Sequence, residues 1–241
     1  ISLLSGHIGG GNRLANAIAA GIGATPVITT ATDVNGRFAV DAWAAEQGFV
    51  LGSMAAAKDI AATILERDVP ICADGPMRGT LPAGLYSGAE GDVGISVSMR
   101  TKKPFSETLS VIPRALTLGL GCRRGTAKEA IEQTVFEVFK ENGLDLRAVR
   151  EAASIDLKAD EPGLLAFCEQ LGISVLFYAA ETLAAVRGSF TPSAFVQEVT
   201  GVDNVCERSA AAGGGKLIVK KTARRGVTVA VAETAWEVNF E

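Results

Sequence analysis

Short β-rich runs alternate with longer alanine-rich stretches along most of this 241-residue chain, and this alternation constrains the fold more than any other feature. It is typical of an α/β fold, in which mainly parallel sheets are flanked by helices. We predict strands at residues 1–4, 27–30, 69–73, 93–99, 116–121, 149–155, 174–178, 216–219 and 227–231. We predict helices at 12–21, 38–48, 54–68, 126–142, 164–171, 180–186, 192–200 and 204–212.

A polar, proline-containing stretch predicts a boundary between two α/β units. Residues 101–104 read Thr-Lys-Lys-Pro, and Pro113 precedes a fresh apolar run. Proline and polar residues between periodic segments are typical of connecting loops. We therefore place a linker between Lys102 and Pro113, with a first unit at residues 1–112 and a second at 113–241.

Charge and hydropathy exclude two broad classes of protein. There are 23 Lys and Arg residues against 27 Asp and Glu, a formal net charge of −4, so the chain is not a strongly basic nucleic-acid binder. No apolar run approaches the roughly 18 residues that a membrane-spanning helix needs. We expect a cytoplasmic globular protein that binds neither nucleic acid nor membrane.

Cysteine and histidine usage argues against a protein-bound metal. The four cysteines lie far apart and form no CxxC pair, which disfavours a zinc ribbon, an iron–sulfur site or a thioredoxin-like motif. The single histidine, His7, excludes a site built from several histidines. Because the chain begins at Ile1 within a strand-like run, we expect it to be incomplete at its amino terminus.

A first polar cluster lies at a predicted strand-to-helix turn near the amino terminus. Gly9 and Gly10 would let backbone N–H groups approach an anion, and Asn12 opens the helix that follows. His7 beside them is either a proton-transfer or carboxylate-binding group, or a residue hydrogen-bonded within a tight turn.

A second cluster follows the strand at 116–121. Gly119, Gly121 and Gly125 have a G-x-G-x-x-x-G spacing, a variant of the dinucleotide fingerprint. Arg123 and Arg124 repel one another unless an anion lies nearby, so they are candidate grips for a phosphate or carboxylate. Thr126 has the place of an N-cap, and Glu129 would complete a capping box.

A third cluster follows the strand at 149–155, at the edge where open α/β sheets bind ligands. Ser154, Asp156, Lys158 and Glu161 belong to it, and its carboxylates are equally explained as ordinary acidic residues at a helix start.

Three lesser features have simpler explanations. Thr30 and Asp33 end the strand at 27–30, in a turn or as ligand contacts. Thr191 has the place of a helix cap before Pro192. The basic residues at 220–225 fit a solvated hairpin turn.

Several motifs taken together resemble one family. Residues 4–12 (LSGHIGGGN) with 27–33 (VITTATD) resemble the amino-terminal half of the cobalt-precorrin-5A hydrolases of anaerobic cobalamin biosynthesis. The carboxyl-terminal domain of that family is resembled by 119–126 (GLGCRRGT), 153–161 (ASIDLKADE), 191–193 (TPS) and 201–207 (GVDNVCE). The family usually has a longer amino-terminal segment than this chain, and Gly11 stands where we expect alanine.

The resemblance implies an enzyme that opens the δ-lactone of a cobalt corrinoid and expels acetaldehyde, giving cobalt-precorrin-5B. Cobalt then belongs to the tetrapyrrole substrate, and we expect no cofactor. A homodimer and other corrin-pathway enzymes are the assemblies that the resemblance leaves open.

Residue type and place, rather than the resemblance, suggest the individual roles. The candidate bases are Glu161, which is narrowly favoured, then His7, and third Asp156. Lys158 is the candidate that stabilises the oxyanion. Arg123 and Arg124 are the carboxylate clamps. The remaining expected substrate contacts are Gly9, Gly10, Asn12, Thr30, Asp33, Gly121, Cys122, Ser154, Ser193 and Glu207.

Two alternatives stay open on the sequence. One is a dinucleotide-dependent oxidoreductase using Gly119, Gly121 and Gly125, although the first acidic residue after the next strand, Asp156, lies well beyond the offset of about 20 residues that the fingerprint expects. The other is a corrinoid-binding protein without catalysis, because the second unit also resembles a small stand-alone protein of the aerobic cobalamin route.

Overall fold

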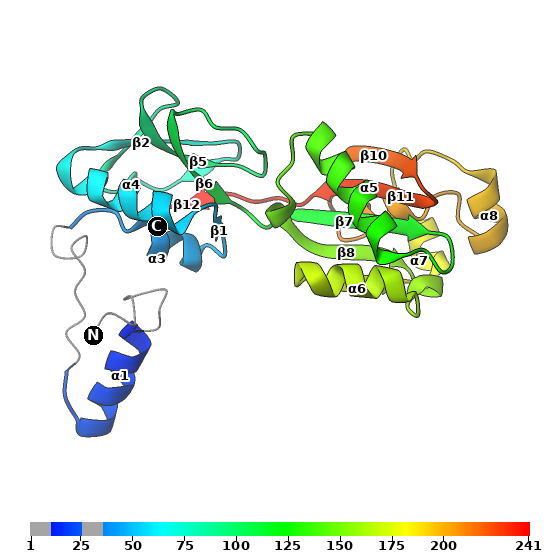
Figure 1. Cartoon of the computed structure of the whole chain (residues 1–241), viewed down its shortest axis with the longest axis horizontal. Helices are drawn as coiled ribbons and strands as arrows, with labels where there is room; N and C mark the ends of the chain where they lie inside the picture. Colours follow the sequence, from blue (N-terminus) through cyan, green and yellow to red (C-terminus); the bar gives the residue numbers. More distant parts are fainter. Residues whose placement is uncertain (1–10, 26–35) are drawn as a thin grey trace. The chain divides into compact units, whose positions relative to one another are not determined.

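The computed structural model describes residues 11–25 and 36–241, and their contacts divide into two units (Figure 1). Unit 1 contains the described residues up to Ser98 together with Lys102–Pro113 and Glu237–Glu241, and unit 2 contains Met99–Thr101 and Arg114–Trp236. Each unit has a mixed sheet with a run of parallel strands and accompanying helices, so the α/β prediction is confirmed. Helix α1 (Gly11–Ile22) matches the helix predicted at 12–21. The strands predicted at 1–4 and 27–30 lie outside the described residues.

Unit 1 is built on a five-stranded sheet of order β1-β6-β5-β2-β4, in which β1 is antiparallel to β6 and the other pairs are parallel. The strands are β1 (Val50–Leu51), β2 (Val69–Ala73), β4 (Leu85–Ser87), β5 (Val93–Val97) and β6 (Glu107–Ile112). Helix α3 (Val40–Glu46) precedes β1, and α4 (Met54–Glu66) packs on β2, β5 and β6 with Ile60 and Ile64 fully buried.

The carboxyl terminus belongs to unit 1, which corrects the assignment of all of 113–241 to the second unit. Strand β12 (Val238–Asn239) pairs in parallel with β3 (Met77–Arg78). The next residue, Phe240, stacks on Trp43 with ring centroids 5.4 Å apart. The indole Nε1–H of Trp43 also donates to the carbonyl of Asn239 at 2.8 Å. Aromatic stacking and strand pairing, which local sequence periodicity does not reveal, therefore place the last five residues in this unit.

The linker predicted between Lys102 and Pro113 is wrong for most of its length. Residues 107–112 form β6, which pairs with β5 over five registered positions and lies inside the sheet. The lysines and proline at 102–104 occupy only the loop before this strand. The chain passes into unit 2 after Pro113.

Unit 2 has a five-stranded sheet of order β10-β11-β7-β8-β9. Its parallel part consists of β7 (Leu116–Cys122), β8 (Val149–Ile155) and β9 (Ser174–Tyr178), and an antiparallel hairpin of β10 (Lys216–Arg224) and β11 (Val227–Glu233) extends it beside β7. The hairpin turns at Arg225 and Gly226, which both have positive φ, 52° and 78°. That geometry is the twist-compatible two-residue turn and lets β10 run five residues beyond its predicted end.

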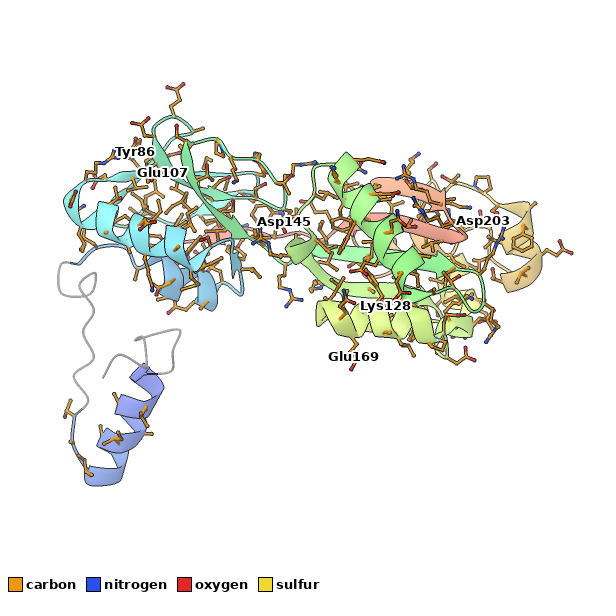
Figure 2. All side chains as sticks on the ribbon, viewed as in Figure 1. Tyr86, Glu107, Lys128, Asp145, Glu169 and Asp203 are labelled. Carbon is orange, nitrogen blue, oxygen red and sulfur yellow. The ribbon has the colours of Figure 1, made fainter. Side chains whose placement is uncertain are left out.

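The helices of unit 2 pack in two groups. Helices α5 (Lys128–Glu141) and α6 (Pro162–Leu171) contact each other, and Nζ of Lys128, labelled in Figure 2, donates to Gln170 Oε1 at 2.7 Å. Helix α9 (Cys206–Ala211) packs on β7, β8 and β11. The remaining elements are α7 (Ala180–Ala185), α8 (Ala194–Thr200) and the 3-10 turns η1 (Leu146–Ala148) and η2 (Asp156–Lys158).

Gly119 lies within β7, where α9 approaches the strand closely. A β-carbon at Gly119 would lie 1.9 Å from the carbonyl oxygen of Cys206 and 2.8 Å from Cβ of Ala210. The glycine is therefore required by helix–strand packing. The G-x-G signal read as a dinucleotide loop falls inside a strand, where this packing explains it.

We expect Gly119→Ala to lower the free energy of unfolding of unit 2 by about 3 kcal/mol or more, the upper end for an overpacked core, because the obstructing atom belongs to the α9 backbone. Urea unfolding followed by circular dichroism measures the change. The matched control is Gly213→Ala, since a β-carbon there meets nothing within 4 Å. A Gly119→Ala protein as stable as the control would contradict the packing argument.

The capping box predicted at Thr126 and Glu129 is wrong. Helix α5 begins at Lys128 after Ala127, and no side chain caps it. The hydroxyl of Thr126 donates instead to the carbonyl of Arg123 at 2.6 Å, closing the turn after β7. That turn is constrained further at Gly163, where a β-carbon would lie 2.1 Å from the Thr126 carbonyl oxygen.

Candidate functional site

A cavity of about 800 Å³ lies in unit 2, a volume within the usual range for ligand sites. The residues after β7 and β8 line one part of it, and the β10–β11 hairpin, α8 and the start of α9 line the rest. The cavity therefore includes the carboxyl ends of two neighbouring parallel strands, where open α/β sheets place ligands.

The charge lining the cavity is entirely positive among the described residues. Two arginines and a lysine come from the turn after β7 and from η2, and the hairpin adds one more lysine and two more arginines, whereas no Asp or Glu lines it. The six are Arg123, Arg124, Lys158, Lys221, Arg224 and Arg225. Such a wall suits a ligand with several carboxylates or phosphates.

Four of these six cations are already paired with acidic residues. Arg124 meets Asp160 at 3.1 Å and Lys158 meets Glu161 at 3.1 Å. Arg224 and Arg225 share Glu137, and Arg224 also binds Glu141. Arg123 and Lys221 have no ion pair in the described part of the chain. The structure thus distinguishes Arg123 from Arg124, which the sequence treated alike.

Glu161 is buried beneath the cavity wall and does not line it. Its side chain is 1% exposed. One carboxylate oxygen accepts the backbone N–H of Gly125 at 2.5 Å, and the other accepts Nζ of Lys158 at 3.1 Å. This carboxylate fixes Lys158 and the Gly125 turn in place. The geometry favours a positioning role over the general-base role that the sequence narrowly favoured.

Glu207 is a second buried carboxylate, placed outside the cavity lining. Thr191 donates to it twice, through its backbone N–H at 2.6 Å and its hydroxyl at 2.8 Å, and the backbone N–H of Lys221 donates at 2.6 Å. Asn204 Oδ1 accepts the N–H of Glu207 at 2.8 Å. Thr191 therefore binds Glu207, and the predicted Thr191 cap of the next helix is wrong: α8 begins at Ala194 after Ser193.

The structure brings several other predicted residues to the cavity and leaves some away from it. Gly121, Cys122 and Ser193 line it. Ser154 is fully buried and donates to the carbonyl of Leu120 at 2.7 Å, so it joins β8 to β7. Asp156 is exposed at the start of η2 and does not line the cavity. His7, Gly9, Gly10, Thr30 and Asp33 lie outside the described residues, and Asn12 belongs to α1.

The two cysteines at the cavity are poor nucleophiles at neutral pH. Burial raises the pKa of the Cys122 thiol, and Lys158 offsets this only in part. Burial also raises the pKa of Cys206 to about 11. Because the thiolate is the reactive form, both side chains act as small, weakly polar parts of the wall.

Sequence reasoning missed Lys221 and the apolar wall of α8. From the sequence, Lys221 fitted a solvated turn. The β10 bulge that separates it from Lys220 depends on strand pairing, which the local sequence does not show. Phe195 and Val199 looked like ordinary positions of a short helix, yet they are 72% and 59% exposed and line the cavity. Their i, i+4 spacing places them on one face of α8, which was the available signal.

Within residues 11–25 and 36–241, no group of three or more His, Cys, Asp or Glu side chains is arranged to hold a metal ion. No helix in these ranges combines the length and hydropathy required to cross a bilayer.

Two family models match the chain. "Cobalamin synthesis G C-terminus" matches residues 116–232, and "Cobalamin synthesis G N-terminal" matches residues 1–33.

Relatives and a solved structure are similar over different shares of the chain. A cobalt-precorrin-5A hydrolase of Priestia megaterium is 30% identical over 254 residues, covering 96% of this chain and 68% of the relative. One of Salmonella typhimurium is 31% identical over 244 residues, covering 95% and 70%. The crystal structure of CobE, a protein from the cobalamin (vitamin B12) biosynthetic pathway, is 33% identical and covers 52% of this chain and 93% of that chain, with a TM-score of 0.48.

Proposed function

The chain belongs to the cobalt-precorrin-5A hydrolase family, and from this premise we propose that it hydrolyses cobalt-precorrin-5A in cobalamin biosynthesis. The reaction opens the δ-lactone of the substrate, releases acetaldehyde and gives cobalt-precorrin-5B. The observation that supports a site for this reaction is the cavity of unit 2. Among the described residues, its charged lining consists of six cations and no carboxylate.

The proposed reaction has two balanced steps. Water adds to the lactone carbonyl, and the ring C–O bond breaks to leave a carboxylate and a free hydroxyl. A base then removes the hydroxyl proton, the adjacent C–C bond breaks, acetaldehyde leaves, and the conjugated macrocycle takes up the electron pair and a proton. Cobalt enters and leaves as part of the substrate, so the proposal requires no cofactor of the protein.

Lys158 is the residue that we assign to the developing oxyanion. Its Nζ is held by Glu161, and its side chain is 15% exposed at the cavity wall. An ammonium group has three donors, so one N–H binds Glu161 and the others remain for a substrate oxygen. A charged donor fixed before the reaction stabilises a developing negative charge without reorganising at the moment of reaction.

We assign carboxylate binding to Arg123, because its guanidinium forms no ion pair with a described residue and it lines the cavity. Arg124 is less available than Arg123 to bind a substrate carboxylate, because it already forms an ion pair with Asp160 at 3.1 Å. Cobalt corrinoids with free carboxylates fit a wall of this kind.

The oxidoreductase alternative loses its motif in this fold. Gly119 is explained by α9, and a β-carbon at Gly121 would lie 2.5 Å from the hydroxyl of Thr228. Cytoplasmic location, a homodimer and association with other corrin-pathway enzymes stay predictions.

Acetaldehyde release tests the function directly. The full chain is incubated with cobalt-precorrin-5A, and acetaldehyde is measured through NADH oxidation by alcohol dehydrogenase, with mass spectrometry of the corrinoid to record loss of the two-carbon fragment. We expect one acetaldehyde for each substrate consumed. Tight binding of the corrinoid with no acetaldehyde and an unchanged mass would overturn the enzymatic proposal in favour of a corrinoid-binding protein.

A further inference from the structure

Strand β10 contains a bulge at its two consecutive lysines. Val219 pairs with Val231, and the next registered pair is Thr222 with Val229. Lys220 and Lys221 therefore stand opposite the single residue Ala230. Two residues against one define a β-bulge, which bends the strand and redirects a side chain.

The bulge sends the two lysines to different environments. Lys221 is half-buried and lines the cavity, whereas Lys220 is exposed and does not line it. Lys221 also forms no ion pair with any described residue. It is a cation placed at the cavity wall without a counter-charge from the described residues, a position that suits an anionic group of a ligand.

Buried Glu207 fixes the backbone of the bulge at Lys221. Its carboxylate accepts the backbone N–H of Lys221 at 2.6 Å, within the bulge itself. Burying a carboxylate is costly unless hydrogen bonds satisfy it, and here its further partners are the N–H and hydroxyl of Thr191. Thr191 lies in the segment that leads into α8, so the same carboxylate fixes both the bulge and the entry to that helix.

Helix α8 gives the cavity an apolar surface, whereas Lys221 gives it a positive charge. Phe195 and Val199 are 72% and 59% exposed there. Arg208 contacts the chain on both sides of α8: its guanidinium lies 4.6 Å from the ring centroid of Phe190 before the helix, and its Nε binds Asp203 after the helix at 2.7 Å. Apolar side chains beside unpaired cations are complementary to a macrocycle with carboxylates at its rim.

We propose that Lys221 binds a carboxylate of the macrocyclic substrate and that Glu207 is the positioning residue that presents it. The proposal deepens the function given above and rests on it for the ligand class. Glu207 then affects substrate binding only through Lys221, because its carboxylate fixes the backbone from which the lysine side chain extends.

Binding of cobyrinic acid, a cobalt corrinoid with free carboxylates, tests the role of Lys221 without turnover. Absorbance titrations compare the full chain with Lys221→Gln and with Lys220→Gln, its neighbour from the same bulge. We expect Lys221→Gln to raise the Kd about 10- to 100-fold, the cost of losing a hydrogen bond to a charged group. Lys220→Gln should change it less than 3-fold.

The methyl ester of the same corrinoid separates carboxylate recognition from apolar contact. It should bind the full chain and Lys221→Gln with Kd values within 3-fold of each other, because it carries no charge for the lysine. Equal weakening by the two lysine variants, equal loss for acid and ester, or no binding of cobyrinic acid by the full chain would each overturn the proposal. Acetaldehyde release from the unaltered protein is scored separately, so the hydrolase function and this inference can fail independently.

A double-mutant cycle tests the positioning role of Glu207. Glu207→Gln should weaken cobyrinic acid binding about 10-fold in the unaltered background and less than 2-fold when Lys221 is already Gln. A merely structural role would weaken binding equally in both backgrounds, which would overturn the positioning claim. Thermal melting confirms folding of each variant, and the Lys221→Gln against Lys220→Gln comparison stands even where Glu207→Gln does not fold.

Discussion

Lys158→Met should lower turnover by about 10²- to 10³-fold, the usual cost of removing one preorganised donor from an oxyanion site. The expectation follows from the place of Nζ at the cavity wall, where Glu161 holds it at 3.1 Å. Methionine keeps an unbranched apolar side chain that ends one heavy atom short of the ammonium nitrogen, so the loss isolates the charged donor. Steady-state acetaldehyde release at saturating cobalt-precorrin-5A measures it.

A second effect of this substitution must be separated from the first. Lys158→Met leaves Glu161, which is 1% exposed, without its cationic partner. An uncompensated buried charge costs about 3–5 kcal/mol of stability. The double variant Lys158→Met/Glu161→Gln removes that charge while still lacking the donor. We expect it to regain stability in urea unfolding and to remain catalytically impaired; recovery of turnover along with stability would show that Lys158 acts through folding alone.

His7→Asn should remove about two to four orders of magnitude from turnover, the scale of losing general-base catalysis. His7 lies outside the described residues, and the argument for it comes from the other candidates. Both oxygens of Glu161 are engaged by Gly125 and Lys158, and neither Glu161 nor Asp156 lines the cavity. An imidazole also titrates near ~6.5 without tuning, which suits a base at neutral pH.

Glu161→Gln is the matched comparison. Glutamine retains one carbonyl oxygen to accept the Gly125 N–H but no longer balances the charge of Lys158, so we expect a loss of about tenfold or less. The acidic limb of the pH–rate profile should persist in this variant and vanish in His7→Asn. A loss of more than 10²-fold in Glu161→Gln, with stability intact and His7→Asn near wild type, would restore Glu161 as the base.

Most of the regular structure was predictable from local pattern. The strands at 69–73, 149–155 and 174–178 match β2, β8 and β9 at both ends, because each segment is bounded by turn or helix signals and β2 and β9 are mostly apolar. Strands of two or three residues, such as β1, β3 and β4, are too short to show a period. β6 was not predicted because the lysines and proline just before it indicated a connecting loop.

The sequence by itself determined the α/β class, the family resemblance and the two turns after β7 and β8 that line the cavity in unit 2, since strand-end turns follow from local pattern. Only the tertiary structure decided which charges remain available. Arg123 and Arg124 are adjacent in sequence, yet Arg124 is paired with Asp160, 36 residues away. Lys220 and Lys221 are also adjacent, yet a bulge held by Glu207 directs one of them to the cavity. Charge pairing and strand register depend on groups distant along the chain, and local periodicity carries no information about them.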